Sequence, residues 1–253
     1  MNTFFLDRLN SEPHALAFAG QSTPWPVALA DQSANPALDE ALHTHAAAAQ
    51  ALLYPVSAEL LATTGRPVDL FGFEPNPARL GAAAAASASV PGIALTQLGA
   101  LLDAAALGYN PAQAKPVAVL GHSQGVLAVH MVQAICEAGS IDAAAAKIDE
   151  ILAIATLIGV AGTRQARQLG LAARHGEATP MLSVKDITRA QVDALIERVD
   201  GARGPIAVAV TNSATHYVLS GYPEDLAAFG VEVAKEHKRQ AQLREEKVRG
   251  GRV

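Results

Sequence analysis

The sequence predicts an α/β protein built from a larger and a smaller subdomain. Three observations lead to this prediction. Residues 116–138 read as a short apolar strand, a tight turn and a helix. Much of the chain before residue 173 is rich in alanine with apolar residues at helical spacing, and strand and helix patterns alternate from about residue 177. At 253 residues, half of them hydrophobic, the chain is long enough for a sizeable core.

The larger subdomain is predicted to span residues 1–176. A short apolar run ending in glycine, ALAFAG at 15–20, is typical of a first strand. A loop then leads into alanine-rich helices that continue to about residue 65, and the prolines of 66–80 indicate an irregular connection. The remaining predicted elements are a helix at 90–109, a strand at 116–120 and helices at 125–138 and 141–173, separated at Gly139.

The smaller subdomain is predicted to span residues 177–240. The composition changes near Glu177, after which a strand is followed by a helix that Asp186 or Thr188 can cap. Residues 205–238 then read as two alternating strands, a turn and another helix. A β-α-β-β-α order of this size is typical of a ferredoxin-like unit.

The segment GHSQG at 121–125 is the clearest chemical motif. Ser123 lies between a predicted strand and a predicted helix, which is the setting of a nucleophile elbow. Gly121 and Gly125 leave room for the sharp turn, and the N–H of Gln124, at the start of the helix, is a natural first oxyanion donor. The alternative is a glycine-rich turn that holds an incidental serine.

Composition excludes several classes of function. The net charge of −5 gives no basic surface for nucleic acid. No run of eighteen strongly apolar residues predicts a membrane span, and the N-terminus has acidic residues and no long apolar core, unlike a signal peptide. The single cysteine, Cys136, fits a reducing compartment and is expected to pack in the core. We therefore expect a cytoplasmic globular protein.

Five segments together resemble the acyltransferase domains of fatty acid and polyketide synthases. The likeness is greatest to the acetyltransferase domain at the N-terminus of the type I fatty acid synthases of actinobacteria and fungi. The segments are ALAFAGQS (15–22), SVPGIALTQL (89–98), AVLGHSQGVLAVHMVQA (118–134), TLIGVAG (156–162) and VTNSATHYVLSG (210–221). The resemblance implies an α/β-hydrolase-like large subdomain with an inserted ferredoxin-like small subdomain, and it implies that 241–253 begin the return to the large one.

The resemblance also implies a reaction. The catalytic serine, here Ser123, takes an acetyl starter group from acetyl-CoA and hands it to the phosphopantetheine of an acyl carrier protein, by ping-pong nucleophilic catalysis. The backbone N–H groups of Gln21 and Gln124 would form the oxyanion hole. The implied partners are the carrier protein, other fatty acid synthase domains on the same longer chain and further copies of that chain in a large homo-oligomer. No metal and no bound cofactor is expected.

Four further residues are candidates for substrate binding. Malonyl-specific family members carry an arginine before a glycine in the long helix after the elbow, where this sequence has Ile158. An aliphatic residue there favours acetyl over malonyl, because a malonyl carboxylate would lack its partner; alternatively, Ile158 is a core residue. Arg164 or Arg167 nearby could still bind a carboxylate or the phosphates of coenzyme A. His122, Gln97 and Asn212 complete the set, and Gln97 could instead be structural.

The family's general base, a histidine in a P-x-H-S/T motif, has no match in these residues. His216 is expected to be a surface or packing residue, and His43 and His45, two apart on a predicted helix, should face different directions. We expect the base to lie past Val253, in a longer chain of which this is a truncated stretch. Two alternatives stay open: a serine hydrolase or esterase, which shares G-x-S-x-G, and a non-catalytic fragment of a megasynthase.

Overall fold

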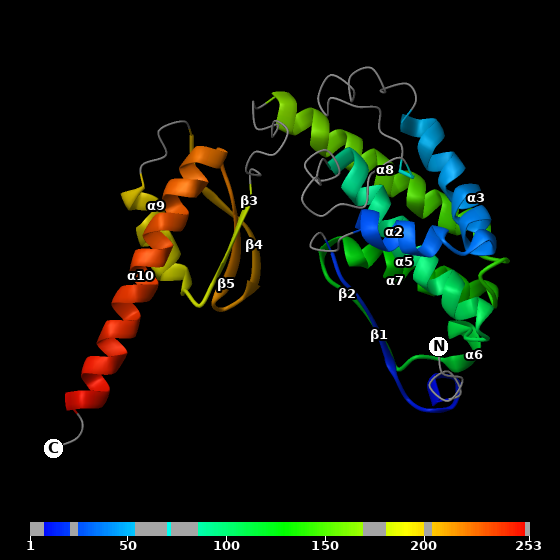
Figure 1. The fold of residues 1–253 in the computed structure, drawn as a ribbon, viewed down its shortest axis with the longest axis horizontal. Helices are drawn as coiled ribbons and strands as arrows, with labels where there is room; N and C mark the ends of the chain where they lie inside the picture. Colours follow the sequence, from blue (N-terminus) through cyan, green and yellow to red (C-terminus); the bar gives the residue numbers. More distant parts are fainter. Residues whose placement is uncertain are drawn as a thin grey trace. The chain divides into compact units, whose positions relative to one another are not determined.

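The computed structural model describes residues 8–20, 25–53, 70–71, 86–168, 181–199 and 204–250. The chain divides into two compact units. The first contains Met1–Gln165 and Arg174–Gly176, and the second contains Ala166–Ala173 and Glu177–Val253. Figure 1 shows the elements of each unit in the order of the chain.

The first unit combines a pair of parallel strands with helices. Its elements are β1 (Ala15–Phe18), α2 (Trp25–Ser33), α3 (Pro36–Leu53), α5 (Ala86–Ala106), α6 (Pro111–Ala114), β2 (Ala118–Gly121), the 3₁₀ turn η3 (Ser123–Gly125), α7 (Val126–Ala138) and α8 (Ala145–Gln168), whose last residues count with the second unit. Strands β1 and β2 lie side by side in register from Ala15 opposite Ala118 to Phe18 opposite Gly121 (Figure 1). Their carboxyl ends therefore meet at one edge, which is where ligand sites of parallel sheets form.

Helix α5 is the central element of this unit's core. Its residues from Ser87 to Gly99 are all buried, which explains why its apolar residues lie on every side. By length and composition α5 could cross a membrane, but 72% of its apolar window is buried inside the structure, and the core helix of a soluble protein meets the same criteria. Small residues allow close packing: a Cβ on Gly92 would lie 2.5 Å from the Trp25 ring.

Helix α8 packs equally closely on the start of α5. A Cβ on Gly159 would meet the carbonyl oxygen of Ala86, so only glycine fits at this crossing. The buried N–H of Ser87 donates to Thr163 Oγ1 at 2.9 Å, which satisfies one of the free donors at the N-terminus of α5. These contacts fix the helix that contributes Gln97 and the helix that contributes Ile158 to each other.

The second unit has the predicted β-α-β-β-α order. Its elements are β3 (Met181–Lys185), α9 (Arg189–Arg198), β4 (Ala207–Ser213), β5 (His216–Ser220) and α10 (Pro223–Gly250). The sheet is antiparallel with strand order β3-β5-β4. Alternate residues of β5, Tyr217 and Leu219, are buried in a core with Phe229 of α10, and both helices cover the same face of the sheet (Figure 1).

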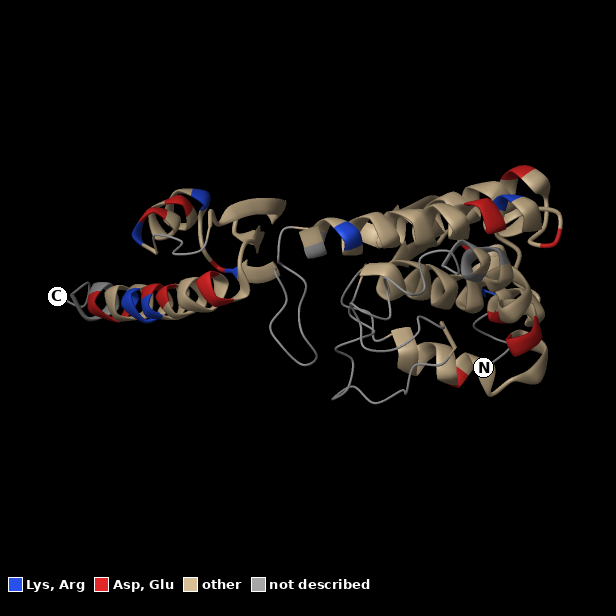
Figure 2. Ribbon diagram, turned by 90° about the horizontal axis from the view of Figure 1, so that it is seen from above, with Lys and Arg blue, Asp and Glu red and all other residues tan. Residues whose placement is uncertain are grey.

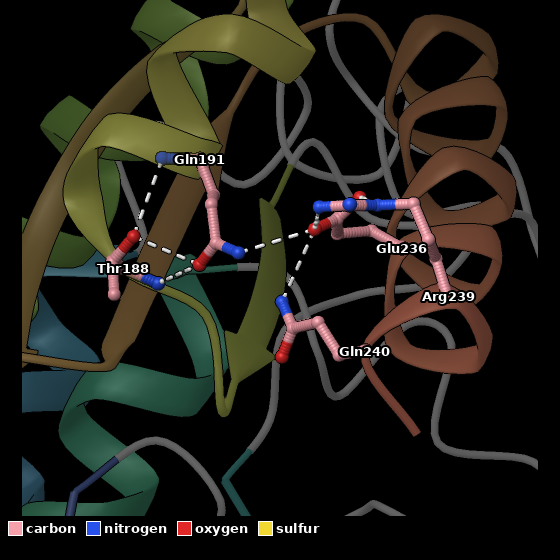
Figure 3. Close-up of polar contacts among 5 residues, drawn as sticks. All are labelled: Thr188, Gln191, Glu236, Arg239 and Gln240. Carbon is pink, nitrogen blue, oxygen red and sulfur yellow. Dashed lines mark hydrogen bonds and ion pairs between the residues drawn. The ribbon is translucent and has the colours of Figure 1, made fainter. Parts of the chain in front are cut away.

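A polar cluster connects the two helices of this unit (Figure 3). Thr188 and Gln191 form a capping box at the N-terminus of α9. The Gln191 side chain also donates from Nε2 to Glu236 Oε1 of α10 at 3.1 Å. Arg239 and Gln240 donate to the same carboxylate at 2.7 and 3.2 Å. These hydrogen bonds, that of Arg239 first, lower the pKa of Glu236 from 4.5 to about 2, although desolvation opposes the shift.

Two details differ from the sequence-based expectations, and one alternative that the sequence left open is decided. Residues 241–250, expected to begin a return to the larger subdomain, form the last part of α10. Residues of both charges occur along this helix (Figure 2), and those of its last part, Arg, Glu and Lys, are good helix formers. Cys136, expected in the core, is exposed on α7. Of the two proposed caps of α9, Thr188 is the cap, whereas Asp186 lies in the preceding turn with a φ of 56°.

Candidate active site

Ser123 lies on a sharp turn between β2 and α7. Its φ is +54°, a left-handed conformation that non-glycine residues seldom adopt. His122 before it is still extended, with φ −101° and ψ 129°, and Gly125 and Val126 after it are already helical. A serine held in this strained conformation between a strand and a helix has the geometry of a nucleophile elbow.

The two glycines of the motif occupy positions that no other residue fits. A Cβ on Gly121 would lie 2.6 Å from the backbone of Gly125 and of Val126. A Cβ on Gly125 would meet the carbonyl oxygen of Phe18 at the end of β1. The interpretation of GHSQG as a turn that needs space on both sides of the serine therefore agrees with the backbone geometry.

Residues 18–20, which we call the strap, pass directly beside the turn. The His122 N–H donates to the Phe18 carbonyl at 3.0 Å, which extends the pairing of β1 and β2 by one residue. A Cβ on Gly20 would lie 2.8 Å from Ser123 Cβ and 3.3 Å from the Gln124 nitrogen. Gly20 was not among the predicted site residues, although the FAG segment that contains it carried part of the family resemblance.

The predicted oxyanion donors can be traced only in part. The Gln124 N–H belongs to the first turn after Ser123, where helical N–H groups have no intrahelical acceptor. Its nitrogen lies near the strap, 3.3 Å from the position that a Cβ on Gly20 would take. Gln21, the second predicted donor, lies outside the described residues. Its predicted role stays a prediction.

Ser123 and His122 are exposed. Among the described residues, the Ser123 hydroxyl makes no hydrogen bond. Also within the described ranges, no group of three or more His, Cys, Asp or Glu side chains could hold a metal ion. The chemistry that the turn itself offers is an accessible hydroxyl next to backbone donors.

Gln97 has a more specific position than sequence reasoning gave it. It belongs to α5 and is buried, with 8% of its surface exposed. Its Nε2 donates to the Ala19 carbonyl of the strap at 2.5 Å. The Gln97 side chain therefore binds the backbone of the strap that lies beside Ser123.

Ile158 is 52% exposed on α8, which excludes the alternative that it is a core residue. Leu157 beside it is 55% exposed, whereas Gly159 is buried against α5. Arg164, further along α8, is also exposed, and the side chain of Arg167 lies outside the described part of the chain. The role of Ile158 in an acyl pocket stays a prediction.

Asn212 belongs to β4 of the second unit. Its Nδ2 lies 3.4 Å from His216 Nε2, and the Ser183 hydroxyl lies 2.9 Å from the same nitrogen. His216 is thus a half-buried residue that contacts polar neighbours on the sheet. Asn212 is described within its own unit, and its proposed contact with substrate is untested.

A cavity of about 440 Å³ lies apart from the predicted site residues, between α2, α3 and residues 70–71. In its wall, the His43 ring stacks on Phe71, and His43 Nε2 lies 3.5 Å from Asp39. His45 instead bonds Asp149 of α8 at 2.7 Å. The two histidines therefore face different neighbours, as the sequence predicts.

Comparisons with known proteins give matches at three levels. Residues 180–253 match the family model described as "Fatty acid synthase central AT domain". The chain is 30% identical over 128 residues to "Fatty acid synthase beta subunit hexB" of Dothistroma septosporum, which covers 46% of this chain and 7% of that protein.

Similar solved structures include the malonyl CoA-acyl carrier protein transacylase (fabD) of Coxiella burnetii, with 18% identity and a TM-score of 0.51. The acyl-carrier-protein-S-malonyltransferase of Bartonella henselae has 18% identity and a TM-score of 0.45. The matches cover 89% of this chain and 58% and 60% of those chains. The chain thus spans less than two thirds of the length of these relatives. The fold is that of acyl-carrier-protein transacylases, which confirms the predicted α/β-hydrolase-like fold class.

Proposed function

We propose that this chain is an acyltransferase module of fatty acid synthesis, in which Ser123 carries the acyl group. The observation that supports this most directly is the left-handed conformation of Ser123 at a strand-to-helix turn, with the strap against it. The family-model match at 180–253 and the partial match to a fatty acid synthase β subunit favour transfer over hydrolysis. We place the reaction in the cytoplasm, with no metal and no bound cofactor.

The proposed reaction has two steps. The Ser123 hydroxyl attacks the thioester carbonyl of acyl-CoA, its proton passes to the departing thiolate, and an acyl ester of Ser123 forms. The thiol of a phosphopantetheine group on an acyl carrier protein then attacks this ester and regenerates the serine. In both steps the N–H of Gln124, and by our proposal that of Gln21, would stabilise the oxyanion; one such donor is worth about 3–4 kcal/mol.

We further propose that the acyl group is acetyl rather than malonyl. The aliphatic side chain of Ile158 supports this choice, because it offers no cation to pair with a malonyl carboxylate. The similar solved structures are named as malonyl transferases, so the two substrates need to be compared directly. The acceptor would be an acyl carrier protein, and the working assembly would be a large homo-oligomer with further synthase domains.

Mass spectrometry of the Ser123 peptide after brief exposure to acetyl-CoA or malonyl-CoA tests this function. Wild type and Ser123→Ala are compared, with and without added imidazole as a substitute base. The proposal expects an acetyl adduct on Ser123, little malonyl adduct and release of the acetyl group to added pantetheine. A larger malonyl adduct would reject the substrate preference. Release as free acetate despite pantetheine would indicate a hydrolase, and no adduct under any condition would indicate a non-catalytic module.

A further inference from the structure

The strap beside Ser123 receives a side-chain hydrogen bond from α5. The Nε2 of Gln97 donates to the Ala19 carbonyl at 2.5 Å, across 78 residues of sequence. Because a carbonyl oxygen can only accept, the nitrogen of the amide must face the strap. The next residue of the strap, Gly20, is the one whose Cβ position lies 2.8 Å from Ser123 Cβ. Gln97 thus acts on the backbone one residue away from the contact with the serine.

The helix that contributes Gln97 is held firmly from its other side. Gln32 of α2 donates from Nε2 to the Thr96 carbonyl at 2.9 Å, and a Cβ on Gly99 would meet the Gln32 side chain. Trp25 of the same helix packs against Gly92. Gln97 therefore projects from a fixed support, and its hydrogen bond transmits that fixed position to the strap.

The second polar atom of the Gln97 side chain, Oε1, argues against a role in packing alone. Its Oε1 is fully buried and has no hydrogen-bond partner within the described part of the chain. Burying an unpaired acceptor is unfavourable, and an apolar side chain of similar length would avoid that cost. The hydrogen bond to Ala19 is the interaction that only the amide supplies.

We propose that Gln97 is a positioning residue that sets the strap against Ser123, and thereby sets the rate of acyl-enzyme formation rather than the affinity for acyl-CoA. This inference rests on the proposed function, because it assumes that Ser123 is acylated beside the strap. In this proposal Gln97 acts through the strap, and not by the direct contact with substrate that the sequence suggested. A misplacement of about 1 Å in such a site can cost up to about a hundredfold in rate.

The test compares Gln97→Met with Gln32→Met. Each variant removes one hydrogen bond from a glutamine amide to a backbone carbonyl, that of Ala19 in the strap for Gln97 and that of Thr96 in α5 for Gln32, so only the first releases the strap. We expect Gln97→Met to lower the rate constant of acylation at saturating acetyl-CoA by about tenfold or more, with the half-saturating concentration unchanged. Gln32→Met loosens one support of α5 but keeps the hydrogen bond from Gln97 to Ala19, so it should slow acylation much less. A raised half-saturating concentration in Gln97→Met, or equal slowing in both variants, would overturn the proposal.

Gln97→Glu allows a second measurement, the pH dependence of the acylation rate, which a simple loss of stability would not change. A protonated carboxyl can donate to the Ala19 carbonyl, whereas a carboxylate can only repel it. Burial raises the pKa of a carboxyl, so the rate of this variant relative to wild type should recover as the pH is lowered towards 5. The rate of Gln97→Met relative to wild type should not change over the same pH range. A flat ratio for Gln97→Glu would contradict a role through hydrogen-bond donation.

Hydrogen exchange separates this inference from the proposed function. Amides of a peptide that covers residues 15–20 should exchange at least about tenfold faster in Gln97→Met than in Gln32→Met, and this holds whether or not the chain reacts with acyl-CoA. If wild type takes up no acyl group but the strap loosens, the proposed function fails and the positioning of the strap stands. If acylation proceeds and the strap exchanges equally in both variants, the positioning role fails alone.

Discussion

Gly20 lies so close to Ser123 that a Cβ on the glycine would come within 2.8 Å of the serine Cβ. The contact joins the end of β1 to the turn after β2, two segments about a hundred residues apart. Real Cβ atoms do not approach this closely, so one of the two segments must move when Gly20 gains a side chain. The position of the serine hydroxyl is therefore coupled to the strap.

Gly20→Ala should impair acylation more than it impairs folding. We expect a loss of about 1–3 kcal/mol in the free energy of unfolding of the first unit, as for other overpacked sites, together with a fall of at least about tenfold in acyl-adduct formation. The fluorescence of Trp25, the only tryptophan and a buried residue of this unit, reports the unfolding. Gly162→Ala is the control, because its new Cβ would have ordinary contact with Ala86 at 3.4 Å. If both variants react equally, the strap does not position Ser123.

Ser123→Gly should be more stable than Ser123→Ala. Both variants remove the hydroxyl, so neither should form an adduct with acyl-CoA. Alanine keeps a Cβ at a φ of +54°, whereas glycine adopts that conformation without strain, a difference of about 1 kcal/mol. Urea unfolding, followed by Trp25 fluorescence, measures this difference in the free energy of unfolding. Equal stabilities would mean that the turn is not strained in solution.

The elbow could be predicted from sequence because it is local. Five consecutive residues hold the glycines, the serine and the first helical donor, and a strand and a helix flank them. The order of elements in the second unit was also predictable, since Thr188 and the alternation of β5 are short-range signals. The contact between Gln97 and the strap could not be predicted in this way. Gln97 and Ala19 are 78 residues apart, and no local pattern indicates which amide binds which carbonyl.

Other errors concern the face or the length of a helix. Cys136 lies in a helix whose neighbouring residues Ala134 and Ile135 are buried, yet its own position on the helix is exposed. Composition alone does not decide this, because one residue corresponds to about 100° of rotation. The predicted helix ended near residue 238 and 241–253 were expected to begin a return to the larger subdomain, whereas α10 continues to Gly250 through residues that are good helix formers.

Acid should weaken the second unit through Glu236. Its pKa is about 2 in the folded protein against 4.5 for the free group, so the unfolded chain binds more protons between these values. The contribution of Glu236 to stability is complete above about pH 4.5 and falls as the pH falls towards 2. Amide exchange of α9, corrected for intrinsic rates, should show smaller opening free energies at pH 3 than at pH 6.

Two substitutions isolate that effect. Glu236→Gln should remove most of the pH dependence of α9 opening, since the neutral amide does not titrate. Glu232→Gln on the same helix removes a more exposed pair with Lys235, at 2.6 Å, and should leave the dependence nearly unchanged. The same pH dependence in Glu236→Gln as in wild type would assign the acid sensitivity to other groups.

Ile158→Arg should shift the choice of acyl group towards malonyl. A guanidinium at this exposed position can pair with a carboxylate, and we expect the ratio of malonyl to acetyl adduct on Ser123 to rise by about tenfold or more. Because the residue lies on the surface, the stability should change by no more than about 0.5 kcal/mol. Competition between the two thioesters at equal concentration, read from the mass of the Ser123 peptide, gives the ratio.

Leu157→Arg is the matched control for this prediction. Leu157 is exposed to a similar degree on the same helix, but successive residues point about 100° apart around the axis. The same charge is thus added one position away, and long-range attraction of malonyl-CoA should be nearly equal in both variants. If only Ile158→Arg changes the ratio, residue 158 faces the acyl group. If both change it equally, the effect is general electrostatic attraction, and the assignment of Ile158 to the acyl pocket is wrong.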